Sequence, residues 1–282
     1  MLRKLIKYDM SAVWKNALMV SISSIVASVI AGAAMISFDM FNDIDTPIGN
    51  TFSTITLIVM ILAISTILIS VFAIGILVLE RFYKNLFTDE GYLTFTLPVS
   101  RAQIIGAKTI NAMFWSIYEI VLILASVIVM VISSSITGAI LGIDPGTSST
   151  PSTDILNIDG WWIGYAILIV LLSLSCIYYS VSVLQYSITL GSLLAKRARI
   201  IAIIGIYYLI NMVLSFIGQT LMTVFVVFFG DNFFTFISSL SAKGMHIATY
   251  CMLGLGLIIS LGLGILFHWL TVKALNRKLN LT

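Results

Sequence analysis

The chain has 282 residues, of which 60% are hydrophobic and 10% are charged. In a soluble domain about a quarter of the residues are charged, so this composition excludes an ordinary soluble protein. The formal net charge is +3, and because the basic residues lie unevenly along the chain, they indicate orientation in a membrane and not affinity for nucleic acid.

Residues 1–15 form a basic stretch ahead of the first apolar run. On a helix, apolar side chains share one face and basic side chains share the opposite face. The two sets are Leu2, Leu5, Ile6, Met10 and Val13, against Arg3, Lys4, Lys7 and Lys15. We expect a separate amphipathic helix that lies flat at the inner interface. Asp9 falls on the apolar side, where an unpaired carboxylate is costly. It therefore has a basic partner from another cytoplasmic segment or is locally exposed, and we favour exposure.

Six apolar runs are long enough to cross a bilayer, which takes about 20 residues. They are 17–38, 51–79, 110–141, 161–184, 200–229 and 248–270. Runs of this length exclude a closed β-barrel, whose strands are short and alternate in polarity. Ala31-Gly-Ala33 resembles a signal-peptidase site, but the leader is long and patterned and five more runs follow, so we expect an uncleaved first helix.

The basic residues orient these six crossings. All fifteen Lys and Arg residues except Lys243 fall on one side, and that side is the cytoplasmic one because positive charge resists translocation. We therefore predict an all-α integral membrane protein of the cell membrane. It has six transmembrane helices, cytoplasmic N- and C-termini and a single transmembrane domain over residues 1–282.

Residues 80–108, between the second and third runs, form a cytoplasmic excursion that we call the elbow. Its 88–90 segment supplies capping oxygens and negative charge for a short helix that begins near Glu90. That helix must end before Pro98, and Ser100–Gln103 is a capping-box pattern that starts the third membrane helix. Tyr92, Phe95 and Leu97 are then apolar side chains available to a partner. The pattern leaves open whether the elbow binds a partner or only covers its own helix ends.

Residues 231–246, between the fifth and sixth runs, are too apolar for a free loop and too few to cross. We expect them to form short re-entrant helices on the outer side. In the last run, Gly256, Ser260 and Gly264 give a face of small residues that permits close helix approach.

Four polar residues within the runs form a possible transport path. Glu119 lies in the third run, where a charge costs about 2.5–3.5 kcal/mol or more. It is either a proton relay or substrate contact, or a structural carboxyl that is protonated or held by a neighbour such as Gln185 or Asn211, and we favour the structural role. Asn211, Ser215 and Gln219 share one face of the fifth run, where we favour bonding between helices over a path.

The elbow also carries a resemblance to a known family. Glu90-Gly91, then Thr96-Leu-Pro-Val-Ser100, then Ile104-Ile-Gly-Ala-Lys108 resemble the first cytoplasmic loop of type-2 ATP-binding-cassette (ABC) permeases. In that family the loop holds a coupling helix that sits in a groove of the ATPase subunit. The chain departs from the family in having Ile-Gly-Ala-Lys where Gly and Lys are more usually adjacent.

The resemblance implies an ATPase-binding elbow and a smaller second contact. The candidate elbow residues are Asp89, Glu90, Gly91, Tyr92, Phe95, Leu97, Pro98, Val99 and Arg101. The second cytoplasmic turn supplies Lys196, Arg197 and Arg199, which are equally well explained as an orienting basic cluster. The implied partners are a cytosolic ABC ATPase, a second permease copy or related permease, and the lipid bilayer.

The chain has no GxxxxGK[ST] phosphate loop, so we expect ATP and Mg²⁺ to bind the partner ATPase and no cofactor to bind this chain. No HExxH or paired metal-ligand spacing is present, and no catalytic set stands out, so we expect neither a metal site nor an enzyme. We expect the permease of an exporter that moves an amphipathic peptide, drug or lipid-like substrate outward. The alternatives are a secondary transporter or channel that uses Glu119, and a membrane anchor or immunity protein without transport.

Overall fold

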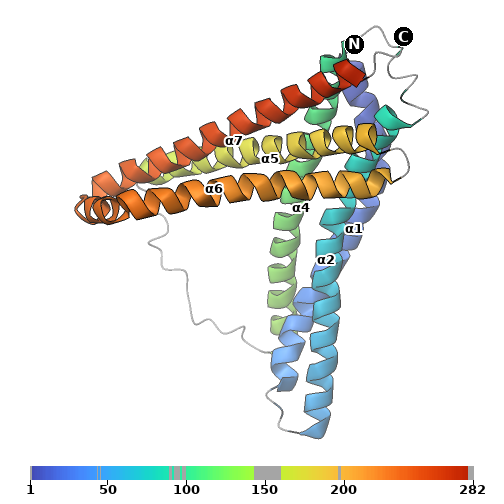
Figure 1. Ribbon diagram of the computed structural model, residues 1–282. Helices are drawn as coiled ribbons and strands as arrows, with labels where there is room; N and C mark the ends of the chain where they lie inside the picture. Colours follow the sequence, from blue (N-terminus) through green and yellow to red (C-terminus); the bar gives the residue numbers. More distant parts are fainter. Residues whose placement is uncertain are drawn as a thin grey trace. The chain divides into compact units, whose positions relative to one another are not determined.

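The computed structural model describes residues 2–42, 44, 46–88, 91, 96, 100–142, 160–195 and 198–278. Among these residues the regular structure is helical and no strand is present. The helices are α1 (Leu2–Asn42), α2 (Pro47–Phe87), α4 (Arg101–Leu141), α5 (Gly160–Leu194), α6 (Arg199–Ser238) and α7 (Ala242–Lys278) (Figure 1). All six are long and apolar enough to cross a membrane. The prediction of a six-span, all-α, multi-pass membrane protein is confirmed at this level.

The helices are longer than a bilayer requires. They have between 35 and 41 residues, which corresponds to about 50–60 Å at a rise of 1.5 Å per residue. The hydrocarbon core is only about 30 Å thick. Each helix therefore continues beyond its apolar run, and α2 extends past Leu79 to Phe87 as expected.

The prediction of a separate interfacial helix over residues 1–15 is wrong. Residues 2–15 are the first turns of α1, which runs without a break from Leu2 to Asn42. The reason is local, since no Gly or Pro occurs before Gly32 and nothing in the sequence ends the helix near Lys15. An amphipathic pattern shows which faces differ, but it does not show where a helix stops.

The prediction of short re-entrant helices over residues 231–246 is also wrong. Residues 231–238 continue α6, and the backbone N–H of Ser239 donates to the carbonyls of Thr235 and Phe236. A short turn follows, and α7 begins at Ala242. Because residues 231–238 contain no Gly or Pro, the helix of the fifth span continues through them.

The helices pack in two compact units. Unit 1 contains α1, α2 as far as Asn85, and α4 from Ile110 onward. Unit 2 contains α5, α6 and α7 together with the described residues between 86 and 109, which include the start of α4. Both α2 and α4 therefore pass from one unit into the other. The prediction of one domain over residues 1–282 stays a prediction.

Unit 1 is held together by small and polar side chains between α1 and α4. The hydroxyls of Ser21 and Tyr118 lie 2.7 Å apart, and Ser133 Oγ donates to the carbonyl oxygen of Val29 at 2.7 Å. A buried apolar cluster contains residues from all three helices. Its members are Val13, Ala17, Ile74, Trp115 and Leu122. Because lipid tails are as apolar as this cluster, close packing and hydrogen bonds supply much of the association energy.

Unit 2 uses the small face of α7 as expected. Ser260 Oγ lies 2.6 Å from Ser175 Oγ of α5. A Cβ added to Gly264 would lie 2.6 Å from Tyr178 Cδ1, so this glycine permits α5 to approach α7 closely. The small-residue pattern of the last span therefore predicts a helix contact correctly, and the contacting helix is α5.

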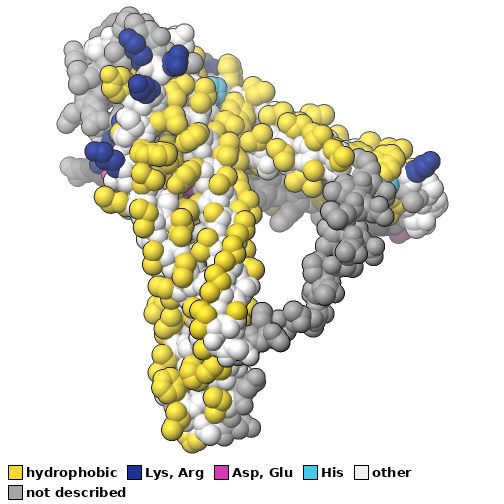
Figure 2. All heavy atoms as spheres, turned by 180° about the vertical axis from the view of Figure 1, so that it is seen from behind, with side chains coloured by type: hydrophobic (Ala, Val, Ile, Leu, Met, Phe, Trp, Pro, Cys, Tyr) yellow, Lys and Arg dark blue, Asp and Glu magenta, His cyan; other side chains and the backbone are white. Residues whose placement is uncertain are grey.

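The surface of both units is apolar over most of its length. Figure 2 shows hydrophobic side chains along the visible faces of the helices, with Lys and Arg side chains gathered toward their ends. Large hydrophobic residues such as Ile22, Leu62 and Phe216 are more than half exposed. A surface of this kind suits lipid and not water.

Candidate functional site

The elbow between α2 and α4 is the first candidate site. Seven of its nine candidate residues lie outside the described residues, and their assignment stays a prediction. They are Asp89, Glu90, Tyr92, Phe95, Leu97, Pro98 and Val99. Gly91 and Arg101 are described, and with the end of α2 they define how the elbow is attached.

Gly91 is buried against the end of α2. Its N–H donates to the carbonyl oxygen of Thr88 at 2.8 Å. A Cβ at this position would lie 2.7 Å from the carbonyl oxygen of Leu86, closer than side-chain carbons normally approach. The backbone of the elbow thus turns back tightly onto α2, and this close approach explains why the position holds glycine.

The start of α4 is capped as the sequence predicts. The N–H of Gln103 donates to Ser100 Oγ at 3.3 Å, and the N–H of Ser100 donates to Gln103 Oε1 at 3.4 Å. These reciprocal bonds are the capping box. They fix the first residue of α4 as Arg101 and so set the direction in which its guanidinium leaves the helix.

Both ends of the elbow are bonded to other helices of unit 2. At the far end, Arg101 Nη1 donates to the carbonyl oxygen of Leu275 on α7 at 2.9 Å. At the near end, Arg199 Nη1 of α6 donates to the carbonyl oxygen of Phe87 at 3.3 Å. Arg199 belongs to the predicted second cytoplasmic contact, whose other members, Lys196 and Arg197, lie outside the described residues. The elbow is therefore attached to α6 and α7.

A buried polar cluster strengthens this attachment two turns further along α4. Thr109 Oγ1 lies 2.9 Å from Gln185 Oε1 on α5 and 3.4 Å from His268 Nδ1 on α7. Thr109 is 4% exposed and Gln185 is 3% exposed. The Thr109 hydroxyl can donate to Gln185 Oε1 while it accepts from the His268 ring, so one hydroxyl bonds to groups on two other helices. The start of α4 is thus joined to both α5 and α7.

This cluster was not predicted from the sequence. Gln185 was proposed as a partner of Glu119, but its oxygen is engaged by Thr109. The only sequence signal was that a Gln and a His occur within otherwise apolar runs. Such residues seek hydrogen bonds across helices, yet the identity of the partner depends on helix packing.

Asp9 identifies a second polar contact, at the end of unit 1 that carries the N-terminus. Its side chain is 6% exposed, and Oδ1 lies 3.3 Å from both Arg81 Nε and Asn85 Nδ2 of α2. The interpretation of Asp9 as locally exposed is wrong, and the alternative of a basic partner from another segment is confirmed. The carboxylate holds the first turns of α1 against the last turns of α2.

Glu119 lies in unit 1, one turn beyond the buried Trp115 on α4. It faces Gly75 of α2, where an added Cβ would lie 3.4 Å from Glu119 Oε1. Among the described side chains none bonds to its carboxylate. Trp115 is 1% exposed, and its Nε1–H also lacks an acceptor in the described part of the chain. The Trp115 N–H and the Glu119 carboxylate, one turn apart on α4, therefore both lack a described partner.

The predicted path residues of α6 are exposed or bond within their own helix. Ser215 and Gln219 are exposed, and Asn211 Nδ2 donates to the carbonyl oxygen of Tyr207 in its own helix. Within the described part of unit 2 these residues bond to no other helix, since α6 packs mainly against α5 and this face is exposed. The assignment of Asn211 as a neighbour of Glu119 stays a prediction.

No protein-family model, curated protein or solved structure matches the chain. Within the described residues, no group of three His, Cys, Asp or Glu side chains could hold a metal ion. Function is therefore inferred from the described contacts within this chain, among which the attachment of the elbow involves the largest number of helices.

Proposed function

We propose that this chain is the membrane-spanning permease subunit of an ABC exporter. It moves an amphipathic peptide, drug or lipid-like substrate outward with energy from a separate ATPase subunit that binds ATP and Mg²⁺. The observation that carries the proposal is the attachment of the elbow to α6 and α7 through Arg199 and Arg101. A force applied to the elbow by a docked ATPase acts on these helices directly.

The division of the helices supports the same mechanism. Alternating access needs two bodies whose arrangement is biased by a partner's nucleotide state. In this chain α2 changes unit after Asn85 and α4 changes unit after Thr109. These two helices flank the elbow, and the described residues between 86 and 109 belong to unit 2, so a force on the elbow acts on unit 2.

The open face of α6 supports a second permease copy. Ser215 and Gln219 lie on a helix whose most apolar stretch has no buried residue. An amide left in hydrocarbon without a partner is costly, and polar side chains commonly bond across membrane helices. A second copy placed over this face supplies that partner and gives the transport path its other wall.

The first test asks whether an ABC ATPase binds the elbow. The tagged chain is expressed in its native host and purified after mild cross-linking, and copurifying ATPases are identified by mass spectrometry. We expect a stable complex that Glu90→Lys reduces at least tenfold. Glu80→Lys is the matched control, because it makes the same charge change at an exposed position of α2. In the wild type, Glu80 pairs there with Lys84. Absence of any ABC ATPase contradicts the proposal and favours a membrane anchor or immunity protein.

A second measurement separates binding from transmission. Arg101→Ala removes the bond to the Leu275 carbonyl and leaves the other candidate elbow residues unchanged. We expect the ATPase complex to persist while ATP-driven substrate movement in proteoliposomes falls about tenfold, because a hydrogen bond from a charged donor contributes about 1.5–3 kcal/mol. Lys15→Ala, an exposed cation on α1, serves as the control. Unchanged coupling in Arg101→Ala contradicts transmission through this contact.

Glu119 supports a second candidate function, a secondary transporter or channel. The carboxylate lacks a described partner and faces the space left by Gly75. If a gradient drives transport through this group, the chain moves substrate in the absence of an ATPase, and Glu119→Gln abolishes that movement. The permease proposal predicts instead that Glu119→Gln changes ATP-driven transport by less than about threefold, since the residue then has a structural role. Proteoliposome uptake with and without the ATPase distinguishes the two.

A further inference from the structure

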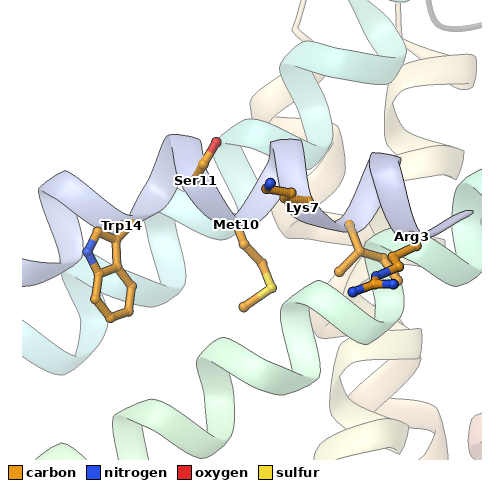
Figure 3. A pocket seen from close by; sticks show the side chains of 6 residues that line it. Arg3, Lys7, Met10, Ser11 and Trp14 are labelled. Carbon is orange, nitrogen blue, oxygen red and sulfur yellow. The ribbon is translucent and has the colours of Figure 1, made fainter.

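A groove of about 570 Å³ lies along the first turns of α1. Its lining residues recur every three or four positions, so they form one face of the helix. Ile6 and Met10 therefore border Arg3 and Lys7, whereas the sequence pattern predicted them on the opposite face. They are Arg3, Ile6, Lys7, Met10, Ser11 and Trp14. Figure 3 shows the Arg3, Met10 and Trp14 side chains extending from the same side of α1. None of the proposed transport functions uses this groove.

The groove is divided by chemistry along its length. Arg3 and Lys7 place two cations at the end nearer the N-terminus, whereas Met10 and Trp14 make the other end apolar. Ser11 Oγ is engaged with the carbonyl oxygen of Tyr8 and adds no free polar group. A ligand that matches both ends is anionic at one end and apolar at the other.

The two cations have no acidic partner in the described part of the chain. The ion pairs present join Arg81 to Asp9 and Lys84 to Glu80. Asp9 is the acidic residue of α1 nearest to them in sequence, and it is buried on the side that faces α2. The local negative charge is therefore neutralised away from the groove, and the charges of Arg3 and Lys7 remain uncompensated within it.

The level of the groove relative to the apolar surface favours a lipid. The Trp14 side chain is 47% exposed, and exposed apolar residues follow it on α1, beginning with Leu18 and Met19. A partly exposed Trp at the start of an apolar surface is typical of the membrane interface. The charged end of the groove then points away from the hydrocarbon, and the apolar end continues into it.

We propose that this groove binds an anionic phospholipid, with the phosphate at Arg3 and Lys7 and the acyl chain along Met10 and Trp14. Phospholipid is favoured over a free phosphate because half of the lining residues are apolar. These residues can contact an acyl chain but cannot bind a soluble anion. The site holds the N-terminal turns of α1 to lipid and does not depend on transport.

The test compares lipid binding to the purified full-length chain in detergent by native mass spectrometry, with equal amounts of phosphatidylglycerol and phosphatidylcholine. We expect the wild type to retain phosphatidylglycerol preferentially. The double variant Arg3→Gln, Lys7→Gln should weaken this binding about 30-fold, since each basic residue near an anionic lipid surface contributes about fivefold and the two factors multiply. The matched control is Lys4→Gln, Lys15→Gln, which removes the same charge from exposed positions of α1 outside the groove.

A second measurement tests the apolar half. Phosphatidylglycerol with brominated acyl chains should quench the fluorescence of Trp14, and the quenched component should disappear in Trp14→Phe. Equal retention of phosphatidylcholine, or an equal loss in the control variant, overturns the proposal because either result indicates non-selective attraction. Displacement of the lipid by equimolar inorganic phosphate also overturns it and indicates a simple anion site.

Discussion

Replacement of Arg81 by alanine is expected to destabilise the protein by about 3–5 kcal/mol, because it leaves the carboxylate of Asp9 buried without its cation. The Asp9 side chain is 6% exposed, and its Oδ1 is 3.3 Å from Arg81 Nε. Asn85, a neutral donor, also bonds this oxygen. In a chain of this size the loss corresponds to a fall in melting temperature of roughly 6–20 °C, measurable by size-exclusion chromatography of heated, detergent-purified protein.

Two further variants isolate the cause of this loss. Lys84→Ala breaks the exposed pair with Glu80 one turn away on the same helix, and such surface pairs contribute about 0–1 kcal/mol. Asp9→Leu in the Arg81→Ala background removes the buried carboxylate that has lost Arg81 and should restore most of the stability. If Lys84→Ala costs as much as Arg81→Ala, or if Asp9→Leu fails to rescue, the buried pair is not what holds α1 to α2.

The spans could be predicted from the sequence because bilayer thickness alone sets their minimum length. Each of the six runs became part of one helix, and the capping box at Ser100 and Gln103 gave the start of α4 to the residue. Both depend on neighbours within a few positions. The ends of α1 and α6 were missed for the same reason, since an amphipathic or mixed segment without Gly or Pro continues a helix instead of ending it.

The contacts of the candidate site could not be predicted in the same way. Nothing near Asp9 in the sequence identifies Arg81 as its partner, and Gln185 was assigned to Glu119 although it bonds to Thr109. These pairings follow from which helices pack together. In a sequence that is apolar throughout, many packings bury similar surfaces, so a single polar residue carries little information about its partner.

The attachment of the elbow also shows why a motif alone leaves its role open. Gly91 matches the resemblance by sequence, but its contact with the Leu86 carbonyl explains the glycine without reference to any partner. From their positions alone, Arg101 and Arg199 could be cytoplasmic charges that only orient the helices in the membrane. Both nevertheless bond to backbone carbonyls, and these bonds attach the two ends of the elbow. The functional proposal gains its support from these two arginines, which do not belong to the conspicuous part of the motif.

Replacement of Gly32 by alanine is expected to cost about 1–3 kcal/mol, the usual range for overpacking a close contact. A Cβ at this position meets the carbonyl oxygen of Met130 and would lie 2.9 Å from the backbone nitrogen of Ser134 on α4. These are backbone atoms, which cannot rotate away as a side chain can. The two helices must therefore separate, and the bond between Ser133 Oγ and the Val29 carbonyl lengthens with them.

Gly262→Ala is the matched control for this substitution, because a Cβ added to Gly262 on α7 has no neighbour within 4 Å. There the same change should be neutral or stabilising by up to about 1 kcal/mol, the difference in helix propensity between alanine and glycine. Thermal unfolding of both variants in one detergent gives the comparison. A stable Gly32→Ala contradicts the close approach of α1 and α4, whereas a loss in both variants assigns the effect to the loss of glycine itself. Opposite signs at the two positions identify backbone contact, and not flexibility, as the reason why α1 carries a glycine in the middle of its span.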